Sequence, residues 1–218
     1  MDKLKSNAKS HNQRYKNKAG ERVPGVTTFL GVLAKPALVP WANKLGLQGI
    51  DVSKYVDSLA GAGTCAHYMI ECYLKREKPD LSNFTSNQIE LAENSVLKFY
   101  DWEKKHTFEV IGSELVLISE KYQYGLTIDL YCKLDGKKTL IDFKTAKAIW
   151  PEMGIQLSAY KAGLEENGYE VEDARILRIG RDEVEGFEDR QITNLDKNFE
   201  LFKHCVAVYN LQKEIRNA

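Results

Sequence analysis

An Asp-Gly pair between two apolar-rich runs constrains this chain more than any other sequence feature. The pair is Asp135-Gly136, and the runs cover residues 122–133 and 138–144. In this setting Asp-Gly predicts a tight two-residue turn between antiparallel strands. Counting outward from such a turn, Asp129 faces Asp142. A four-residue loop over 135–138 would instead place Asp129 opposite Lys144, in an ordinary salt bridge.

Two carboxylates that face each other across a sheet repel, because their Cβ atoms are only roughly 5 Å apart. A hard cation bound between Asp129 and Asp142 removes that repulsion, and such cations prefer oxygen ligands. Side chains alternate along a strand, so Lys144 shares the face of Asp142. The two-residue turn therefore predicts half of a metal site, whereas the longer loop predicts a structural ion pair.

Hydrophobic periodicity along the chain predicts one α/β domain with an N-terminal helical extension. Ser86 and Asn194 are candidate N-caps, Pro151 can occupy a first helical turn, and Gly168 can end that helix. The predicted helices are 27–34, 38–46, 52–76 (broken at Gly61 and Gly63), 86–105, 151–167 and 195–214, and the predicted strands are 108–118, 122–133, 138–144, 174–180 and 187–192. We divide the chain into an arm (1–22), an extension (23–62) and a core (63–218).

Charge is balanced overall but not locally. The chain has 31 Lys plus Arg and 31 Asp plus Glu, so net charge indicates no polyanionic partner. Residues 2–22 carry seven basic side chains against two acidic ones. Either this is a flexible basic arm that contacts phosphates, or it is a solvated disordered tail. The polar start lacks the apolar stretch of a secretory signal, and no apolar run has the length of a membrane span, so we expect a cytoplasmic protein.

The cysteines indicate a reduced compartment and no metal cluster. They are widely spaced and form no Cys-x-x-Cys motif; the four are Cys65, Cys72, Cys132 and Cys205. This spacing matches neither a zinc site nor an iron–sulfur cluster, so we expect buried free thiols and no iron–sulfur cofactor.

Further candidate ligands accompany the hairpin. Glu114 lies in the preceding strand and can converge on the face of the two aspartates, although an exposed strand residue is the simpler interpretation. The carbonyl of Phe143 can add a neutral oxygen, giving a shell suited to Mg²⁺ or Mn²⁺. Lys144 can orient an attacking water and stabilise charge on a phosphate, or it can merely neutralise the aspartates.

Two helical pairs add polar groups at i and i+4 spacing. His67 and Glu71 share a helical face, so His67 is either a further ligand oriented by Glu71 or a structural histidine. Gln156 and Tyr160 share a face of the helix that follows Lys144, where an amide and a phenol can contact phosphate oxygens or a base. Amphipathic helices also produce such pairs without a function.

Taken together, these residues resemble the PD-(D/E)XK nuclease superfamily, in its RecB-like and Cas4-like exonuclease branch. The motifs span roughly 63–165; they are Gly63-Thr64-x-x-His67-x-x-x-Glu71, Glu114, Gly125-x-x-x-Asp129, Ile141-Asp142-Phe143-Lys144-Thr145 and Gln156-x-x-x-Tyr160. The earlier segment is similar to phage nucleases and mitochondrial genome maintenance exonuclease; it contains Val26-Thr27-Thr28-Phe29-Leu30, Lys35-Pro36-Ala37-Leu38 and Trp41. The chain departs from Cas4 in lacking the cluster cysteines, and it carries no helicase motif.

The resemblance implies a restriction-endonuclease-like core, a central mixed sheet flanked by helices. It implies a Mg²⁺- or Mn²⁺-dependent deoxyribonuclease, encoded by a phage, that acts as an exonuclease on single-stranded DNA ends in replication, repair or recombination, alongside proteins of those processes. The implied roles are metal binding by His67, Glu114, Asp129, Asp142 and Phe143, catalysis by Lys144 with the three carboxylates, DNA contacts by Gln156, Tyr160 and Thr145, and support of His67 by Glu71. A structure-specific endonuclease with the same site and a non-cleaving nucleic-acid-binding accessory protein are the alternatives.

Overall fold

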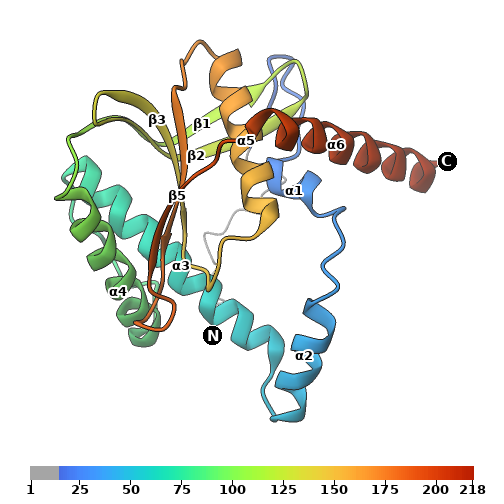
Figure 1. The fold of residues 1–218 in the computed structure, drawn as a ribbon. Helices are drawn as coiled ribbons and strands as arrows, with labels where there is room; N and C mark the ends of the chain where they lie inside the picture. The colour runs from blue at the N-terminus through green and yellow to red at the C-terminus, as the bar shows by residue number, and fades with distance from the viewer. Residues whose placement is uncertain (1–14) are drawn as a thin grey trace.

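The computed structural model describes residues 15–218, so most of the predicted basic arm lies outside the described residues. The described chain confirms the predicted α/β class, with N-terminal helices followed by a five-stranded mixed sheet flanked by helices (Figure 1). The helices are α1 (Val26–Leu30), α2 (Leu38–Leu47), α3 (Val52–Lys75), α4 (Ser86–Glu103), α5 (Pro151–Glu166) and α6 (Leu195–Asn217). The strands are β1 (Phe108–Ser119), β2 (Tyr124–Leu134), β3 (Lys137–Lys144), β4 (Asp173–Ile179) and β5 (Phe187–Gln191). Within 15–218, no helix has the length and apolar character needed to cross a bilayer.

The sheet follows chain order, β1-β2-β3-β4-β5. Strands β1, β2 and β3 form an antiparallel meander, β3 and β4 are parallel, and β4 and β5 are antiparallel. The parallel pair needs a crossover connection, which α5 supplies between β3 and β4. Strand β3 and helix α5 therefore follow each other directly in the chain, and both carry predicted site residues.

The hairpin has the predicted two-residue turn. Leu134 pairs with Lys137, and the same register continues to Leu130 and Ile141. Asp135 and Gly136 both have positive φ, 48° and 87°, the combination that closes a tight hairpin without splaying its strands. The Asp135 side chain accepts a hydrogen bond from the N–H of Thr107 at 2.8 Å, which helps to hold this non-glycine residue in the left-handed region. The longer loop is excluded by this register.

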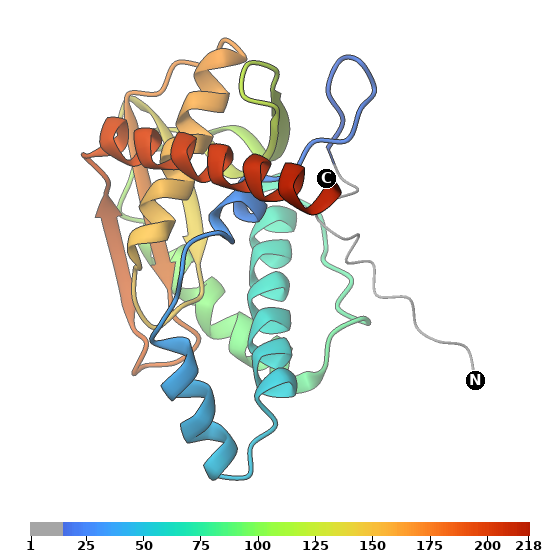
Figure 2. The same cartoon turned by 90° about the vertical axis from the view of Figure 1, so that its right-hand side faces the viewer.

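Two buried clusters hold the helices against the sheet. One includes residues of α1, α5 and α6 with Tyr124 and Leu126 of β2, and α6 lies across α5 (Figure 2). The other includes residues of α3 and α4 with Leu130, Ile141 and Phe143 of β2 and β3. Helix α2 has no buried residue and projects from the body (Figures 1 and 2). The predicted carboxylates and Lys144 thus lie on a sheet that is supported by both helical groups.

The structure corrects two predicted helix boundaries. Helix α3 is continuous through Gly61 and Gly63. A Cβ at Gly63 would lie 2.7 Å from Oγ1 of Thr145, so this glycine permits close packing and does not break the helix. The N-cap of α4 is Thr85 and not Ser86, because the Thr85 hydroxyl and the Gln88 side chain form a reciprocal capping box.

Candidate metal centre

The three predicted carboxylates lie in one row across β1, β2 and β3. The register on either side of Glu114 places it opposite Asp129. The hairpin pairing ends at Leu130 and Ile141, the residues next to Asp129 and Asp142. Glu114 has a φ of 49°, in a left-handed conformation that few non-glycine residues adopt. Such a conformation costs free energy, and here it occurs at the β1 residue that lies beside Asp129.

Helix α3 adds an imidazole to this row. One donor atom from each of His67, Glu114 and Asp129 lies within 4.8 Å of the others, and among residues 15–218 this is the one such group of histidine, cysteine or acidic donors. Nδ1 of His67 is 3.5 Å from Oδ1 of Asp129. One nitrogen and two carboxylate oxygens are donors that can hold a metal ion.

Asp129 is held from two sides. Its Oδ2 accepts a hydrogen bond from the backbone N–H of Phe143 at 2.8 Å, and its Oδ1 faces His67. Burial alone would raise the pKa of Asp129, but the nearby His67 and Lys144 outweigh it and lower that pKa. Burial likewise opposes the imidazolium form of His67, yet the Asp129 carboxylate raises the pKa of His67 overall. The two groups therefore favour each other's charged form when no metal is bound.

Asp142 and Lys144 form a buried pair beside this group. Nζ of Lys144 is 2.5 Å from Oδ2 of Asp142, which is a close ion pair. Burial raises the pKa of Asp142 to about 6, and the charge of Asp129 adds to the effect. Burial also disfavours the ammonium, but Asp142 and Asp129 together raise the pKa of Lys144. Lys144 is thus a cation at neutral pH.

The predicted pair on α5 reaches the same region. Nε2 of Gln156 donates a hydrogen bond to the hydroxyl oxygen of Tyr160 at 2.6 Å. Burial, together with the charges of Asp142 and Asp129, raises the pKa of Tyr160 well above its ordinary value. The phenol is therefore neutral at any working pH and keeps a proton that it can donate.

The other three predicted site residues, Glu71, Thr145 and Phe143, make contacts that the sequence did not predict. Glu71 forms an ion pair with Lys75 one turn along α3, and His67 takes Asp129 as its partner. Thr145 follows β3 and packs its hydroxyl over Gly63 of α3. Phe143 gives its N–H to Asp129, and metal binding by its carbonyl stays a prediction.

Sequence reasoning missed Tyr15, which is buried at the edge of this region. Its hydroxyl is 2.8 Å from Oγ1 of Thr127, two residues before Asp129. The available signal was a single aromatic residue in the basic stretch Arg14-Tyr15-Lys16.

No family model matches the chain, and no curated protein matches it. A crystal structure of a protein from Eubacterium rectale, named "Putative exonuclease", superposes with a TM-score of 0.47 at 14% sequence identity. The match covers 66% of this chain and 64% of that protein. This chain therefore matches less than two thirds of the length of the solved structure, and a likeness at this level assigns neither family nor activity.

Metal binding at this centre is expected to weaken as the pH falls. A divalent ion needs a neutral imidazole, so a proton on His67 competes with it directly, and a proton on Asp142, which lies outside the donor group, removes a neighbouring negative charge. Because the pKa of His67 is raised and that of Asp142 is about 6, the loss should occur as the pH is lowered from about 8 to about 5. Calorimetric titration with Mn²⁺ across this range checks the prediction. His67→Gln should flatten the dependence, whereas His106→Gln, which alters a histidine paired with Asp135, should not; equal profiles for both variants would contradict it.

Proposed function

We propose that this chain is a Mg²⁺- or Mn²⁺-dependent deoxyribonuclease that hydrolyses phosphodiester bonds. One observation carries the proposal: the donor group of His67, Glu114 and Asp129 lies beside the buried Asp142–Lys144 pair. Phe143 lies between Asp142 and Lys144 on β3 and donates its N–H to Asp129, so the pair adjoins the donor group. Phosphodiester hydrolysis needs a cation, a positioned water and stabilisation of negative charge, and these residues can supply the protein's share of each.

His67, Glu114 and Asp129 would hold the ion, and Asp142 would face it from β3. When bound, a divalent ion polarises a phosphate oxygen and lowers the pKa of a coordinated water. Lys144 would hold the attacking water and stabilise the charge that builds on the phosphate oxygens. Asp142 would keep that ammonium protonated and in place.

Residues of α5 and the end of β3 would bind the substrate. Gln156 orients the hydroxyl of Tyr160, which keeps its own proton available for a phosphate oxygen. Thr145 lies directly after Lys144 and can add a hydroxyl contact. We infer an exonuclease acting on single-stranded ends in DNA replication, repair or recombination, together with proteins of those processes.

The test uses end-labelled linear and circular single-stranded DNA of the same sequence, incubated with Mg²⁺, Mn²⁺ or EDTA. Loss of the linear strand alone, abolished by EDTA, is the expected result. Loss of the circle as well would reassign the enzyme as an endonuclease with the same site, because a circle has no end. An intact linear strand with either metal would contradict the nuclease proposal, and a gel-shift assay would then measure DNA binding without cleavage.

A further inference from the structure

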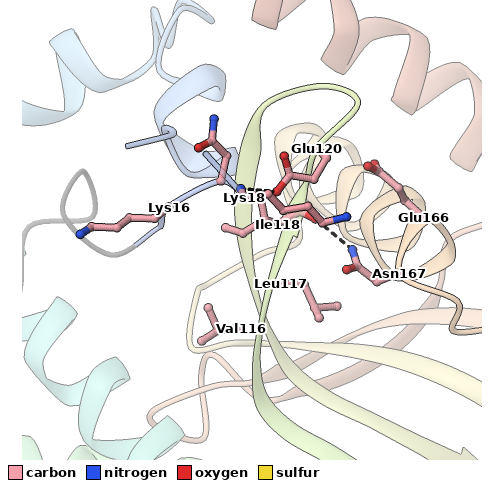
Figure 3. Close-up of a pocket in the computed structure, with 9 residues that line it drawn as sticks. Lys16, Lys18, Val116, Leu117, Ile118, Glu120, Glu166 and Asn167 are labelled. Atoms are coloured by element: carbon pink, nitrogen blue, oxygen red, sulfur yellow. Dashed lines mark hydrogen bonds between the residues drawn. The ribbon is translucent and has the colours of Figure 1, made fainter. Parts of the chain in front are cut away.

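The segment before α1 is attached to the turn between β1 and β2. The N–H of Lys18 donates to Oε1 of Glu120 at 2.8 Å, and the N–H of Gly125 donates to the carbonyl of Pro24 at 2.9 Å. A pocket of about 350 Å³ lies between this segment and the ends of β1 and α5, and Lys18 crosses it towards Asn167 (Figure 3). None of the metal-centre residues lines that pocket. Hydrogen bonds thus hold residues 15–25 in a defined position in the fold.

Tyr15 is the point where this segment enters the interior. Its side chain is 5% exposed, and its ring lies against the backbone of Gly125. A Cβ at Gly125 would lie 1.9 Å from Cγ of Tyr15, so only glycine on β2 allows the ring to take this place. The hydroxyl then reaches Oγ1 of Thr127, and both groups are buried.

This contact lies on the strand that carries Asp129. Thr127 precedes Asp129 by two residues on β2, so the Tyr15 hydroxyl fixes that strand next to its metal-binding carboxylate. Tyr15 therefore ties the N-terminal segment to the strand that carries Asp129.

We propose that Tyr15 is a positioning residue of this active site, acting through the Thr127 hydroxyl to fix the position of β2 and of its Asp129 carboxylate. This inference rests on the proposed function. An anchor that served packing alone would not need the phenolic hydroxyl, because an apolar side chain can fill such a space without a buried polar partner. Catalysis needs the hydroxyl because displacements of about 1 Å lower rates steeply.

The test compares Tyr15→Phe, Thr127→Val and the double variant with Tyr131→Phe, in a steady-state assay on a labelled linear single strand with Mn²⁺. Tyr131 is the matched control, since it is buried on the same strand and donates its hydroxyl to the carbonyl of Glu170. At a temperature well below the unfolding midpoint of every variant, Tyr15→Phe should lower kcat about tenfold with little change in KM. The double variant should be no slower than the single ones, because both changes break one contact. Tyr131→Phe should keep the wild-type kcat.

The inference is overturned if the wild type cleaves and Tyr15→Phe keeps its kcat, or if Tyr131→Phe loses as much activity. The proposed function stands in both of these cases. A wild type that cleaves nothing overturns the proposed function instead. Calorimetric titration of the same proteins with Mn²⁺ then decides the inference: weaker binding by Tyr15→Phe than by Tyr131→Phe supports it, and equal binding overturns it.

Discussion

Replacing Lys144 by alanine should lower the cleavage rate by on the order of 10³-fold while leaving the fold intact. The ammonium is the basic group paired with the buried Asp142, and it also acts electrostatically on Asp129. Without the ammonium, no positively charged side chain would remain beside Asp142 to hold a water or to stabilise negative charge on the phosphate. Single-turnover cleavage of a labelled strand, with circular dichroism of the same samples, checks the result. Lys213→Ala, in the exposed last turns of α6, is the control and should cleave at the wild-type rate.

Lys144→Arg separates catalysis from charge balance. Arginine keeps the positive charge that Asp142 requires, but its planar, spread charge cannot hold a water as a compact ammonium does. If Lys144 is catalytic, the Lys144→Arg variant should be stable but inactive. Near-wild-type cleavage by Lys144→Arg would mean that the lysine only neutralises the aspartates, and it would contradict the role proposed for it.

Asp129→Asn should weaken Mn²⁺ binding by about 100-fold. The asparagine oxygen can still accept the Phe143 N–H, so the local backbone should be retained. The variant loses a negative charge between Glu114 and Asp142, in a region where burial strengthens electrostatic interactions. Calorimetric titration with Mn²⁺ at about pH 8 measures the effect.

The matched control for this change is Asp101→Asn, on the exposed face of α4, where the carboxylate pairs with Lys104. It should bind Mn²⁺ as the wild type does. If Asp129→Asn also bound Mn²⁺ with wild-type affinity, the ion would be held elsewhere, and the donor group with His67 and Glu114 would lose its assignment.

The sequence predicted those parts of the site that depend on local geometry. Asp135-Gly136 determines the turn, and the turn determines the register as far as Leu130 and Ile141, next to Asp129 and Asp142. Strand alternation then places Lys144 within reach of Asp142. These relations depend on contacts between neighbouring strands of one hairpin, which the order of residues specifies directly.

Where several partners competed, sequence spacing did not identify the one that forms. Glu71 is one turn from both His67 and Lys75, and a glutamate followed by a lysine at i+4 is a favourable helical ion pair. His67 meets Asp129, which lies far away in the chain. The same limit applies to Tyr15 and Thr127, because a contact between distant segments has no periodic signature in the sequence.

At the glycines of α3, the sequence predicted a helix break that the structure does not have. Glycine has a low helix propensity, which favoured a break at Gly61 and Gly63. The helix continues because Gln88 and Thr145 occupy the space that side chains at these two positions would need. The residues that pack against these glycines lie later in the chain. Helix propensity takes no account of them, because it considers only the helix's own residues.

The four buried cysteines make the protein convenient for site-specific dye labelling. None forms a disulfide, and burial raises the pKa of Cys65 to about 11 and that of Cys132 to about 12. Maleimides react with accessible thiolates, so these native thiols should stay unmodified in the folded protein at neutral pH. A cysteine introduced at the exposed Ala218 would then carry a single fluorophore, and its anisotropy would follow complex formation with DNA without any native cysteine being removed.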